Sequence, residues 1–332
     1  MLNFAIIGFG GLGKNHFKNA VSIAKADNDI KLVALCDVDN NAFENIPDNQ
    51  KKDFDLSPYK IYNDAGTLFK NEKLDFVITA LPTYIHEKIA VMAMKHKIHV
   101  FSEKPIAISH KEAQNMIDAA KENNVKLMIG QCLRFHPAYI ELKKLIDSKK
   151  YGNVVSAEFA RLSLTPNWSW ENWMLDESKS GMVYLDLHIH DVDFINYVFG
   201  KPLTVTSFTT NSKFDGESVF TVYRYSDNKF VSARADWAFP DNYPFKAEFT
   251  VKFEKAALEF RGNQLKLYTG SGTAVVTDVA KNNCYVDEVI EFINCIRKDR
   301  ASTINPPESN LISLDIALAE KKSAESGKSI DL

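Results

Sequence analysis

The sequence has few of the features that set special classes of protein apart. Lys and Arg total 40 and Asp and Glu total 43, so the formal net charge of -3 leaves no basic surplus that would favour nucleic acid or an acidic membrane. The four cysteines lie far apart, without a CxxC pair or a nearby histidine at ligand spacing, and we expect them to be reduced and mostly buried. Internal repeats and low-complexity segments are absent. Partners are therefore expected to be small molecules or copies of the same chain.

Long hydrophobic runs are also absent. No run is long enough to span a bilayer, and the opening residues 2–7 (LNFAII) lack the basic start and the length of a signal peptide. We therefore expect a soluble, cytoplasmic protein with no membrane partner. The 332 residues, 45% of them hydrophobic and 25% charged, are enough for two domains of ordinary globular composition.

The first third of the chain alternates between short apolar runs and segments with helical spacing. A short continuous apolar run is typical of a strand buried on both faces, and strands separated by helices pair in parallel with right-handed crossovers. The pattern predicts an α/β domain with a doubly wound parallel sheet of the Rossmann type. The expected strands are 4–8, 31–39, 74–82, 98–105 and 125–131, and the expected helices are 12–26, 86–96 and 111–124.

Four glycines occur within six residues, where the first expected strand gives way to the first helix. Gly8, Gly10 and Gly13 form a GxGxxG pattern, and Gly11 adds the fourth glycine. Gly8 would permit a tight turn, Gly10 would let a pyrophosphate approach the backbone, and Gly13 would let the helix pack on the strand. The N–H groups at the start of the helix would bind the phosphates. A purely structural glycine turn is the alternative.

Asp37 follows the second expected strand, about twenty residues beyond the glycines. A carboxylate at this position can accept hydrogen bonds from both ribose hydroxyls of an adenosine, and it would repel a 2′-phosphate. We therefore expect NAD as the cofactor rather than NADP. A solvated turn aspartate is the alternative, and Asp39 and Asn40 could rearrange the pocket.

Ligands of doubly wound sheets bind at the carboxyl ends of the strands, which places Lys104 in the crevice expected for a nicotinamide. Further motifs follow in order along nearly the whole chain: Thr79-Ala80-Leu81-Pro82-Thr83 with His86, Glu103-Lys104-Pro105, Gln131-Cys132-Leu133-Arg134-Phe135-His136-Pro137, Gly181, the segment from Asp186 to Asp193, and Tyr285-Val286-Asp287-Glu288 with Phe292. Together these motifs resemble the Gfo/Idh/MocA oxidoreductase family, which is named for glucose–fructose oxidoreductase, inositol dehydrogenase and a rhizopine catabolism protein.

The resemblance implies a first, NAD-binding domain at 1–130 and a second, α+β domain at 131–332, whose last helix (about 308–326) packs back on the first domain. It implies that the second domain has an open, largely antiparallel sheet with the substrate pocket on one side and often an oligomer interface on the other, and hence a homo-dimer or homo-tetramer. The sequence supports this sheet independently, because segments between residues 154 and 279 alternate polar and apolar side chains at period two.

Asp186 and His190 are four residues apart, so they would project from one face of a helix spanning 182–200. A carboxylate beside an imidazole favours the charged imidazole and fixes its orientation, which makes a proton acceptor that is tunable near neutral pH. The resemblance assigns the role of general base to His190. Asp186 would then bind a substrate hydroxyl, and Lys104 would position that hydroxyl and polarise the forming carbonyl.

The resemblance also implies further binding residues. Besides the four glycines and Asp37, the cofactor would contact Phe9, Leu12, Thr79, Leu81, Pro82, His86, Glu103 and Lys104. The substrate would contact Lys104, Asp186 and His190 together with Arg134, Trp173 and Tyr285. Arg134 could instead form an internal ion pair. The tryptophan loop, residues 168–173, could stack on the C–H surface of a sugar or could simply anchor itself in its own domain.

A metal site is a competing interpretation of one segment, because His188, His190, Asp191 and Asp193 form an HxHDxD cluster. Residues two apart on a helix point to nearly opposite faces, so the two histidines could not easily share an ion. We therefore expect no metal there.

Two positions depart from the pattern of the family. His188 stands where many members have a glycine and is interpreted as a pocket-wall or core residue, and Met182 replaces a glycine that often follows Gly181. Both side chains lie near the expected substrate site, so no particular substrate can be transferred from the family. His16, on the first expected helix, is interpreted as a packing residue near the glycine turn.

These observations predict an NAD-dependent dehydrogenase that oxidises a secondary hydroxyl of a sugar, of a polyol such as an inositol, or of a sugar derivative. A non-catalytic dinucleotide-sensing regulator on the same fold is the alternative, and such a protein would be expected to lose Lys104, Asp186 or His190. A methyltransferase also has a glycine turn followed by an acidic residue, but it gives no reason for the EKP and DxxxH motifs.

Overall fold

The computed structural model describes residues 1–44, 46, 53–210, 217–270, 274–278 and 283–332. The chain divides into two compact units. Unit 1 consists of Met1–Gly130 and Tyr285–Glu308, and unit 2 consists of Gln131–Cys284 and Ser309–Leu332. Among the described residues, no helix combines the length and the apolar character needed to cross a bilayer.

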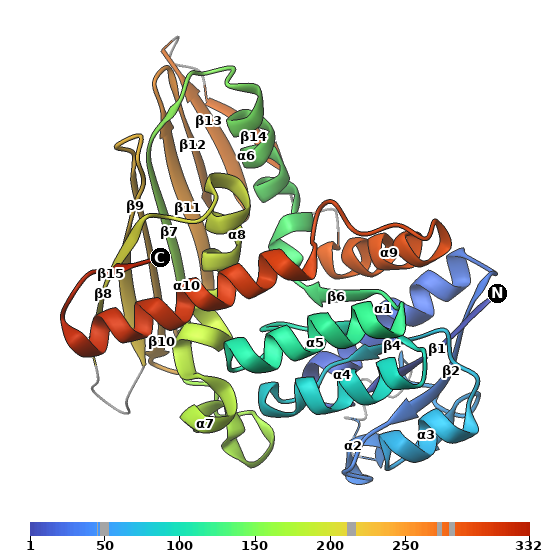
Figure 1. Ribbon diagram of the computed structural model, residues 1–332. Coiled ribbons are helices and arrows are strands. Elements are labelled where there is room, and N and C mark those ends of the chain that lie inside the picture. The colour runs from blue at the N-terminus through green and yellow to red at the C-terminus, as the bar shows by residue number, and fades with distance from the viewer. Residues whose placement is uncertain (45, 47–52, 211–216, 271–273, 279–282) are drawn as a thin grey trace. The chain divides into compact units, whose positions relative to one another are not determined.

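Unit 1 is built on a parallel sheet, in which the described residues form six strands in the order β3-β2-β1-β4-β5-β6 (Figure 1). This arrangement confirms the predicted doubly wound sheet, whose central strands are buried because helices cover both of its faces. The strands are β1 (Leu2–Ile7), β2 (Ile30–Cys36), β3 (Lys60–Tyr62), β4 (Phe76–Thr79), β5 (His99–Glu103) and β6 (Leu127–Gly130).

The helices of unit 1 lie on the two faces of this sheet. They are α1 (Gly11–Ala26), α2 (Asn41–Glu44), α3 (Ala65–Asn71), the 3-10 turn η2 (Thr83–Ile85), α4 (His86–Lys95), α5 (His110–Asn123) and α9 (Cys284–Arg297). Helices α4 and α5 run side by side (Figure 1). Phe292 of α9 packs edge-on against Phe76 and Phe101 of the sheet. This apolar contact explains why residues 285–308 join unit 1, whereas the sequence placed them in a second domain at 131–332.

Unit 2 is built on a mixed sheet, in which the described residues form nine strands in the order β14-β13-β12-β11-β7-β10-β9-β8-β15 (Figure 1). Strands β7 and β10 pair in parallel and the other neighbours are antiparallel, which confirms the predicted largely antiparallel sheet. The strands are β7 (Val154–Leu164), β8 (Thr204–Thr210), β9 (Ser218–Arg224), β10 (Phe230–Phe239), β11 (Lys246–Phe253), β12 (Ala256–Arg261), β13 (Gln264–Thr269), β14 (Ala274–Asp278) and β15 (Ile330–Asp331).

Three helices of unit 2 pack on one face of this sheet. Tyr139 of α6 contacts Phe249 of β11, and Phe194 of α8 contacts Phe159 of β7. Helix α10 joins the same face where the Ser323 hydroxyl accepts a hydrogen bond from a backbone N–H of β8. The helical elements are η3 (Cys132–Phe135), α6 (Pro137–Ser148), η4 (Trp170–Leu175), α7 (Glu177–Ser180), η5 (Tyr184–His188), α8 (Ile189–Phe199) and α10 (Pro307–Ser326). The packing of the last helix on the first domain stays a prediction.

Candidate active site

Two glycines of the turn between β1 and α1 are required by close backbone packing. Gly8 has φ +93°, and a Cβ added there would overlap the carbonyl oxygen of Ala80. A Cβ added at Gly13 would overlap the carbonyl oxygen of Gly8 itself. A larger residue at either position would push the helix away from the strands, so Gly8 and Gly13 have a structural function whether or not a ligand binds.

Gly10 and Gly11 face open space instead. A Cβ added at either position would have no described atom within 4 Å. Gly10 is the N-cap residue of α1, and no described side chain forms a capping hydrogen bond there. The first turn of α1, all of which the structure describes, contains no acidic residue. The first N–H groups of an α-helix have no acceptor within the helix, and this end of the helix carries a partial positive charge. These two positions fit a pyrophosphate that approaches the backbone.

Asp37 lies directly after β2, beside the glycine turn. Its Oδ2 accepts a hydrogen bond of 2.6 Å from the Phe9 backbone N–H, and its Oδ1 accepts one of 2.9 Å from the Asp39 N–H. Each carboxylate oxygen keeps a lone pair for a ribose hydroxyl. The ring of Phe9 is buried among three phenylalanines, so only its backbone faces the turn, and Leu12 is half-buried. The three phenylalanines are Phe17, Phe43 and Phe54.

His86 joins the two loops that follow β4 and β5. Its Nδ1 lies 2.9 Å from the carbonyl oxygen of Pro105, and its Nε2 lies 2.8 Å from that of Leu81. The ring is buried, so it holds the loops together rather than facing a ligand. Burial lowers the pKa of His86, because the low-dielectric interior disfavours the imidazolium. Of the other predicted cofactor contacts here, Thr79 is buried and Pro82 is half-buried.

Glu103 and Lys104 form the end of β5 and the residue after it. The Glu103 carboxylate is buried, and its Oε1 lies 2.6 Å from Nε2 of His16. Its Oε2 accepts a hydrogen bond of 3.1 Å from the Lys104 backbone N–H. Lys104 itself is half-buried. Tyr285 of α9 contacts the His16 ring edge-on, with the centroids 6.4 Å apart. Glu103 thus supports Lys104 from inside the unit.

Asp186 and His190 lie where a π-helix changes into an α-helix. The π-helix covers Tyr184–His188 and is followed directly by α8, whereas the sequence indicated one regular helix. The wider turn results from i→i+5 hydrogen bonding, which occurs frequently at functional sites. Both Asp186 and His190 are half-buried, while His188 between them is fully buried. The segment thus turns His188 inward and leaves the other two side chains partly accessible.

The other members of the HxHDxD cluster are held by separate partners in unit 2. Asp191 forms a bidentate ion pair with Arg161, with two nitrogen–oxygen distances of 3.0 Å. Nε2 of His188 lies 3.1 Å from Oε2 of Glu320 and 3.3 Å from the hydroxyl of Tyr223. Among the described residues, no three His, Cys, Asp or Glu side chains come together as a metal site. The cluster consists of neighbours in sequence that point to different partners.

Arg134 forms the internal ion pair that the sequence left open. Its Nε donates to Oδ2 of Asp193 at 2.8 Å, and its Nη2 donates to Oδ1 at 2.6 Å. The same Nη2 donates to the Ser309 hydroxyl at 2.9 Å, and the guanidinium lies over the ring of Tyr197. The arginine side chain has no exposed surface. This arrangement favours a structural role for Arg134, so we leave it out of the proposed substrate site.

Met182 adopts the left-handed backbone conformation of the glycine that the family resemblance implies there. Its φ is +58°, directly after Gly181 with φ +71°. A side chain in this region is strained, because the Cβ crowds the following carbonyl. The Met182 side chain is buried. Burial of this apolar side chain is favourable and opposes the backbone strain.

The tryptophan loop exposes two of its three indoles. Trp168 is 64% exposed and Trp170 is 49% exposed, whereas Trp173 is half-buried. Glu171 and Asn172 between them have φ +50° and +53°, so the loop makes a left-handed bend. Of the three tryptophans, only Trp173 is buried enough to anchor the loop in its own domain. Trp168 and Trp170 have the exposure needed to stack on a ligand.

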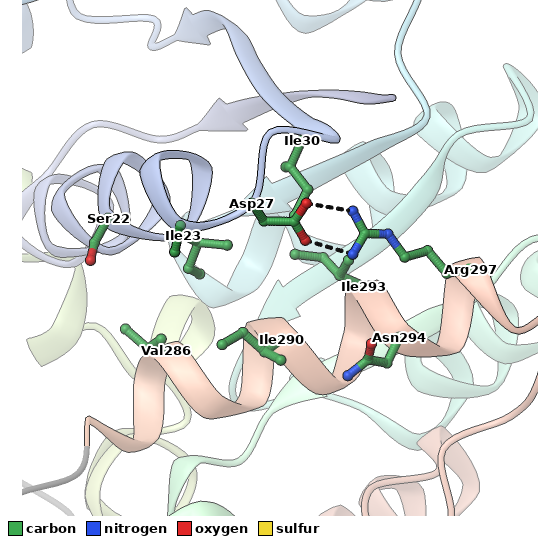
Figure 2. A pocket seen from close by; sticks show the side chains of 10 residues that line it. Ser22, Ile23, Asp27, Ile30, Val286, Ile290, Ile293, Asn294 and Arg297 are labelled. Carbon is green, nitrogen blue, oxygen red and sulfur yellow. Dashed lines mark hydrogen bonds and ion pairs between the residues drawn. The ribbon is translucent and has the colours of Figure 1, made fainter.

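A cavity of about 200 Å³ lies in unit 1 between α1 and α9 (Figure 2). Apolar side chains line it, and the bidentate ion pair between Arg297 and Asp27 borders it. The lining residues are Ser22, Ile23, Ala26, Asp27, Ile30, Val286, Ile290, Ile293, Asn294 and Arg297. The predicted site residues are not among them. We do not assign this cavity to the candidate site.

The predicted site residues fall into one group in each unit. The cofactor residues, Lys104 and Tyr285 belong to unit 1, and the predicted substrate residues of unit 2 are Arg134, Trp173, Asp186 and His190. The meeting of the two groups in one site stays a prediction.

The sequence did not indicate the partner of Glu103, which is His16. The spacing of His16 from Gly13 could have indicated this contact, because residues three apart on a helix lie on the same face and Gly13 faces the sheet.

Two family models match the chain. "Oxidoreductase family, NAD-binding Rossmann fold" matches residues 2–131, and "GFO/IDH/MocA C-terminal domain" matches residues 139–259. The chain is 24% identical to the scyllo-inositol 2-dehydrogenase (NAD(+)) of Bacillus subtilis, over 99% of this chain and 95% of that protein. It is 28% identical to the 2,7-anhydro-N-acetylneuraminate hydratase of Mediterraneibacter gnavus, over 73% of this chain and 64% of that protein.

Solved structures confirm the fold. A levoglucosan dehydrogenase in complex with NADH and levoglucosan superimposes with a TM-score of 0.85 at 18% identity, covering 99% of both chains. For several curated relatives the match is shorter, since the chain spans 52 to 64% of their length.

Proposed function

Since the chain belongs to the Gfo/Idh/MocA oxidoreductase family, we propose that it transfers a hydride between a secondary hydroxyl and a nicotinamide cofactor. The substrate would be a sugar, an inositol or other polyol, or a sugar derivative. One observation carries the proposal: Lys104 stands at the carboxyl end of β5, in the same unit as a glycine turn that is open to a phosphate at Gly10 and Gly11. Doubly wound sheets bind dinucleotides at this end of the strands.

The residues of the chain would handle the hydroxyl and its proton. Oxidation of the CH–OH group to a carbonyl removes a hydride and a proton. The nicotinamide, when bound, accepts the hydride. His190 would accept the hydroxyl proton, with Asp186 orienting the imidazole and binding the substrate hydroxyl. The Lys104 ammonium would position the reacting oxygen and stabilise the negative charge that develops on it.

We propose NAD as the cofactor because of Asp37. Its carboxylate is anchored to the glycine turn through the Phe9 N–H, where it would face the adenosine ribose. A 2′-phosphate would meet the negative charge of this fixed group. NADP is therefore expected to bind less tightly.

An uncharged substrate is favoured by the pairing of two buried arginines in unit 2. Arg134 and Arg161 are each neutralised by a buried aspartate, so their guanidinium groups are committed within the core. The exposed indoles of Trp168 and Trp170 suit the C–H faces of a sugar or cyclitol. Free polyols and sugars are therefore the first compounds to test.

A second candidate is the hydration of an anhydro sugar acid, since the Mediterraneibacter gnavus hydratase is 28% identical to this chain. Hydration adds water to the substrate and leaves the total amount of reduced nicotinamide unchanged. The non-catalytic sensor is a weaker alternative, because Lys104, Asp186 and His190 are all present.

We also propose that the protein forms a homo-dimer or homo-tetramer, which light scattering can test.

The deciding experiment measures absorbance of reduced nicotinamide while the protein is offered NAD with inositols, free sugars and nucleotide sugars, and again with NADP. Reduction with any compound supports the dehydrogenase. A parallel reaction with 2,7-anhydro-N-acetylneuraminate is analysed by mass spectrometry for the gain of one water. Binding of NAD without change in any compound would contradict the proposed activity and favour the sensor.

A further inference from the structure

The Glu103 carboxylate is a buried junction between several segments of unit 1. Its side chain is 5% exposed, and the His16 side chain that faces it has no exposed surface. The carboxylate contacts α1 through His16 at 2.6 Å and the start of the loop after β5 through the Lys104 N–H at 3.1 Å. A Cβ added at Gly130 would lie 3.1 Å from Oε1, so the end of β6 also packs against it. One carboxylate thus connects three elements.

The geometry of this junction leaves little freedom. A buried carboxylate is costly unless hydrogen bonds compensate for its lost hydration. An ionised carboxylate only accepts hydrogen bonds, so its contact with His16 is a hydrogen bond when Nε2 carries a proton, and the Lys104 N–H supplies a second donor. The imidazole lies edge-on to Phe101 at 5.9 Å and to Tyr285 at 6.4 Å. These ring contacts restrict its rotation.

The junction also connects the two parts of the proposed nicotinamide site. His16 lies on α1, whose N-terminus forms the glycine turn, and Glu103 directly precedes Lys104. A shift of α1 would therefore be transmitted to the backbone of Lys104 through two hydrogen bonds. Displacement of a catalytic group by about 1 Å can cost about a hundredfold in rate.

We propose that Glu103 and His16 are positioning residues that fix the backbone of Lys104 relative to the glycine turn. Neither would touch the reacting atoms. This inference rests on the proposed function only in the role that it gives to Lys104. It assigns a role to His16, which the sequence indicated only as a packing residue.

Four variants test this inference. E103Q preserves the volume of the side chain but removes its charge and one acceptor, and H16F preserves a ring but removes the donor. H16Q places an amide N–H donor at a similar distance from Glu103, so it should recover the turnover that H16F loses. H99F is the matched control: His99 lies at the opposite end of β5, where its Nδ1 accepts the Lys126 N–H at 2.8 Å. Thermal unfolding defines the temperature at which each variant is folded.

The first measurement is the split between kcat and NAD affinity. We expect E103Q and H16F to lower kcat about tenfold or more with the NAD Kd changed less than about threefold, H16Q to recover most of the rate, and H99F to lose only thermal stability. Unchanged kcat in E103Q and H16F would overturn the inference. Equal loss of kcat in H99F would also overturn it, because the effect would then be general destabilisation. If H16F does not fold, E103Q and H16Q carry the test.

The second measurement needs no substrate. The NAD-saturated protein is treated with acetic anhydride, and the acetylation rate of Lys104 is followed by mass spectrometry. We expect the rate to change about threefold or more in E103Q and H16F but not in H99F or H16Q. Unchanged reactivity would overturn the positioning role even in an active enzyme. Changed reactivity in a protein that turns over no compound would overturn the proposed function and leave the positioning role supported.

Discussion

Nε2 of His188 lies 3.1 Å from Oε2 of Glu320, and both side chains are completely buried. This pair connects the π-helix to α10 within unit 2. The hydroxyl of Tyr223 completes the group, and burial together with the charge of Glu320 raises the pKa of that phenol well above its ordinary value. The pair accounts for the histidine at position 188 as a residue of the core.

Removal of one member of this pair should be costly. H188L or E320M alone leaves a buried polar group without its partner and should lower the free energy of unfolding by about 3 kcal/mol. The double variant H188L/E320M should lose less than the sum of the two single losses, because apolar packing can replace a buried pair, although the Tyr223 hydroxyl then lacks its partner. Denaturant titration gives these values. D147A, which removes only the exposed partner of Lys143, should change stability by less than about 0.5 kcal/mol. Additive losses in the double variant would contradict this prediction.

Gly10 and Gly13 should respond differently to the same substitution. G13A places a Cβ against the Gly8 carbonyl and should destabilise the protein by about 3 kcal/mol or more. G10A places a Cβ in open space at φ -70° and should change stability by less than about 0.5 kcal/mol while weakening NAD binding about tenfold. Denaturation and calorimetric titration with NAD measure the two effects. Normal NAD affinity in G10A would place the pyrophosphate elsewhere.

The cofactor preference should depend on Asp37. D37A removes the expected ribose acceptor and the partner of the Phe9 N–H, so NAD should bind about tenfold more weakly and NADP much less so. Titration with each dinucleotide measures the change. D55A is the control, because the Asp55 carboxylate is exposed and accepts hydrogen bonds from Ser57. An equal loss for both dinucleotides would argue against contact of Asp37 with the ribose.

Lys104 should affect turnover more than binding. K104A removes the charge proposed to stabilise the reacting oxygen and should lower kcat by about a hundredfold or more, with little change in NAD affinity. Steady-state kinetics and NAD titration separate the two. K88A, at an exposed position of α4, should be indistinguishable from the wild type. A parallel loss of NAD affinity in K104A would show that the lysine binds the cofactor instead.

Acid should weaken unit 1 in part through His86. Burial lowers the folded-state pKa of His86, so below the ordinary value of about 6.5 the unfolded chain binds more protons than the folded chain. This contribution to stability is present above about pH 6.5 and decreases as the pH falls through the lowered pKa. Free energies of unfolding at about pH 8 and pH 5 should therefore differ more in the wild type than in H86Q. An identical difference in the two proteins would show that His86 does not contribute.

The sequence was sufficient for the parts of the fold that depend on local patterns. Residues 4–8 and 98–105 are short apolar runs followed by turn residues, and they correspond to β1 and β5. The glycine turn was predictable because each of its functions needs the absence of a side chain. The parallel sheet followed from strands that alternate with helices.

The parts that could not be predicted depend on contacts between distant residues. His16 and Glu103 are 87 positions apart, and Arg134 meets Asp193 at a separation of 59. The periodicity of apolar residues shows which face of a helix or strand is buried, but it does not show which polar group that face contacts. The sequence therefore left the role of Arg134 open and treated His16 as packing alone.

The π-helix at Tyr184–His188 has a consequence for how the motif can vary. Its wider turn accommodates one residue more than a continuous α-helix would, so it behaves as a local insertion. Loss of one residue within this turn would restore the ordinary winding, while the residues before and after it would keep their faces because the wider turn had absorbed the extra position. The angle between Asp186 and His190 around the helix axis therefore depends on this turn as well as on the identity of the two residues.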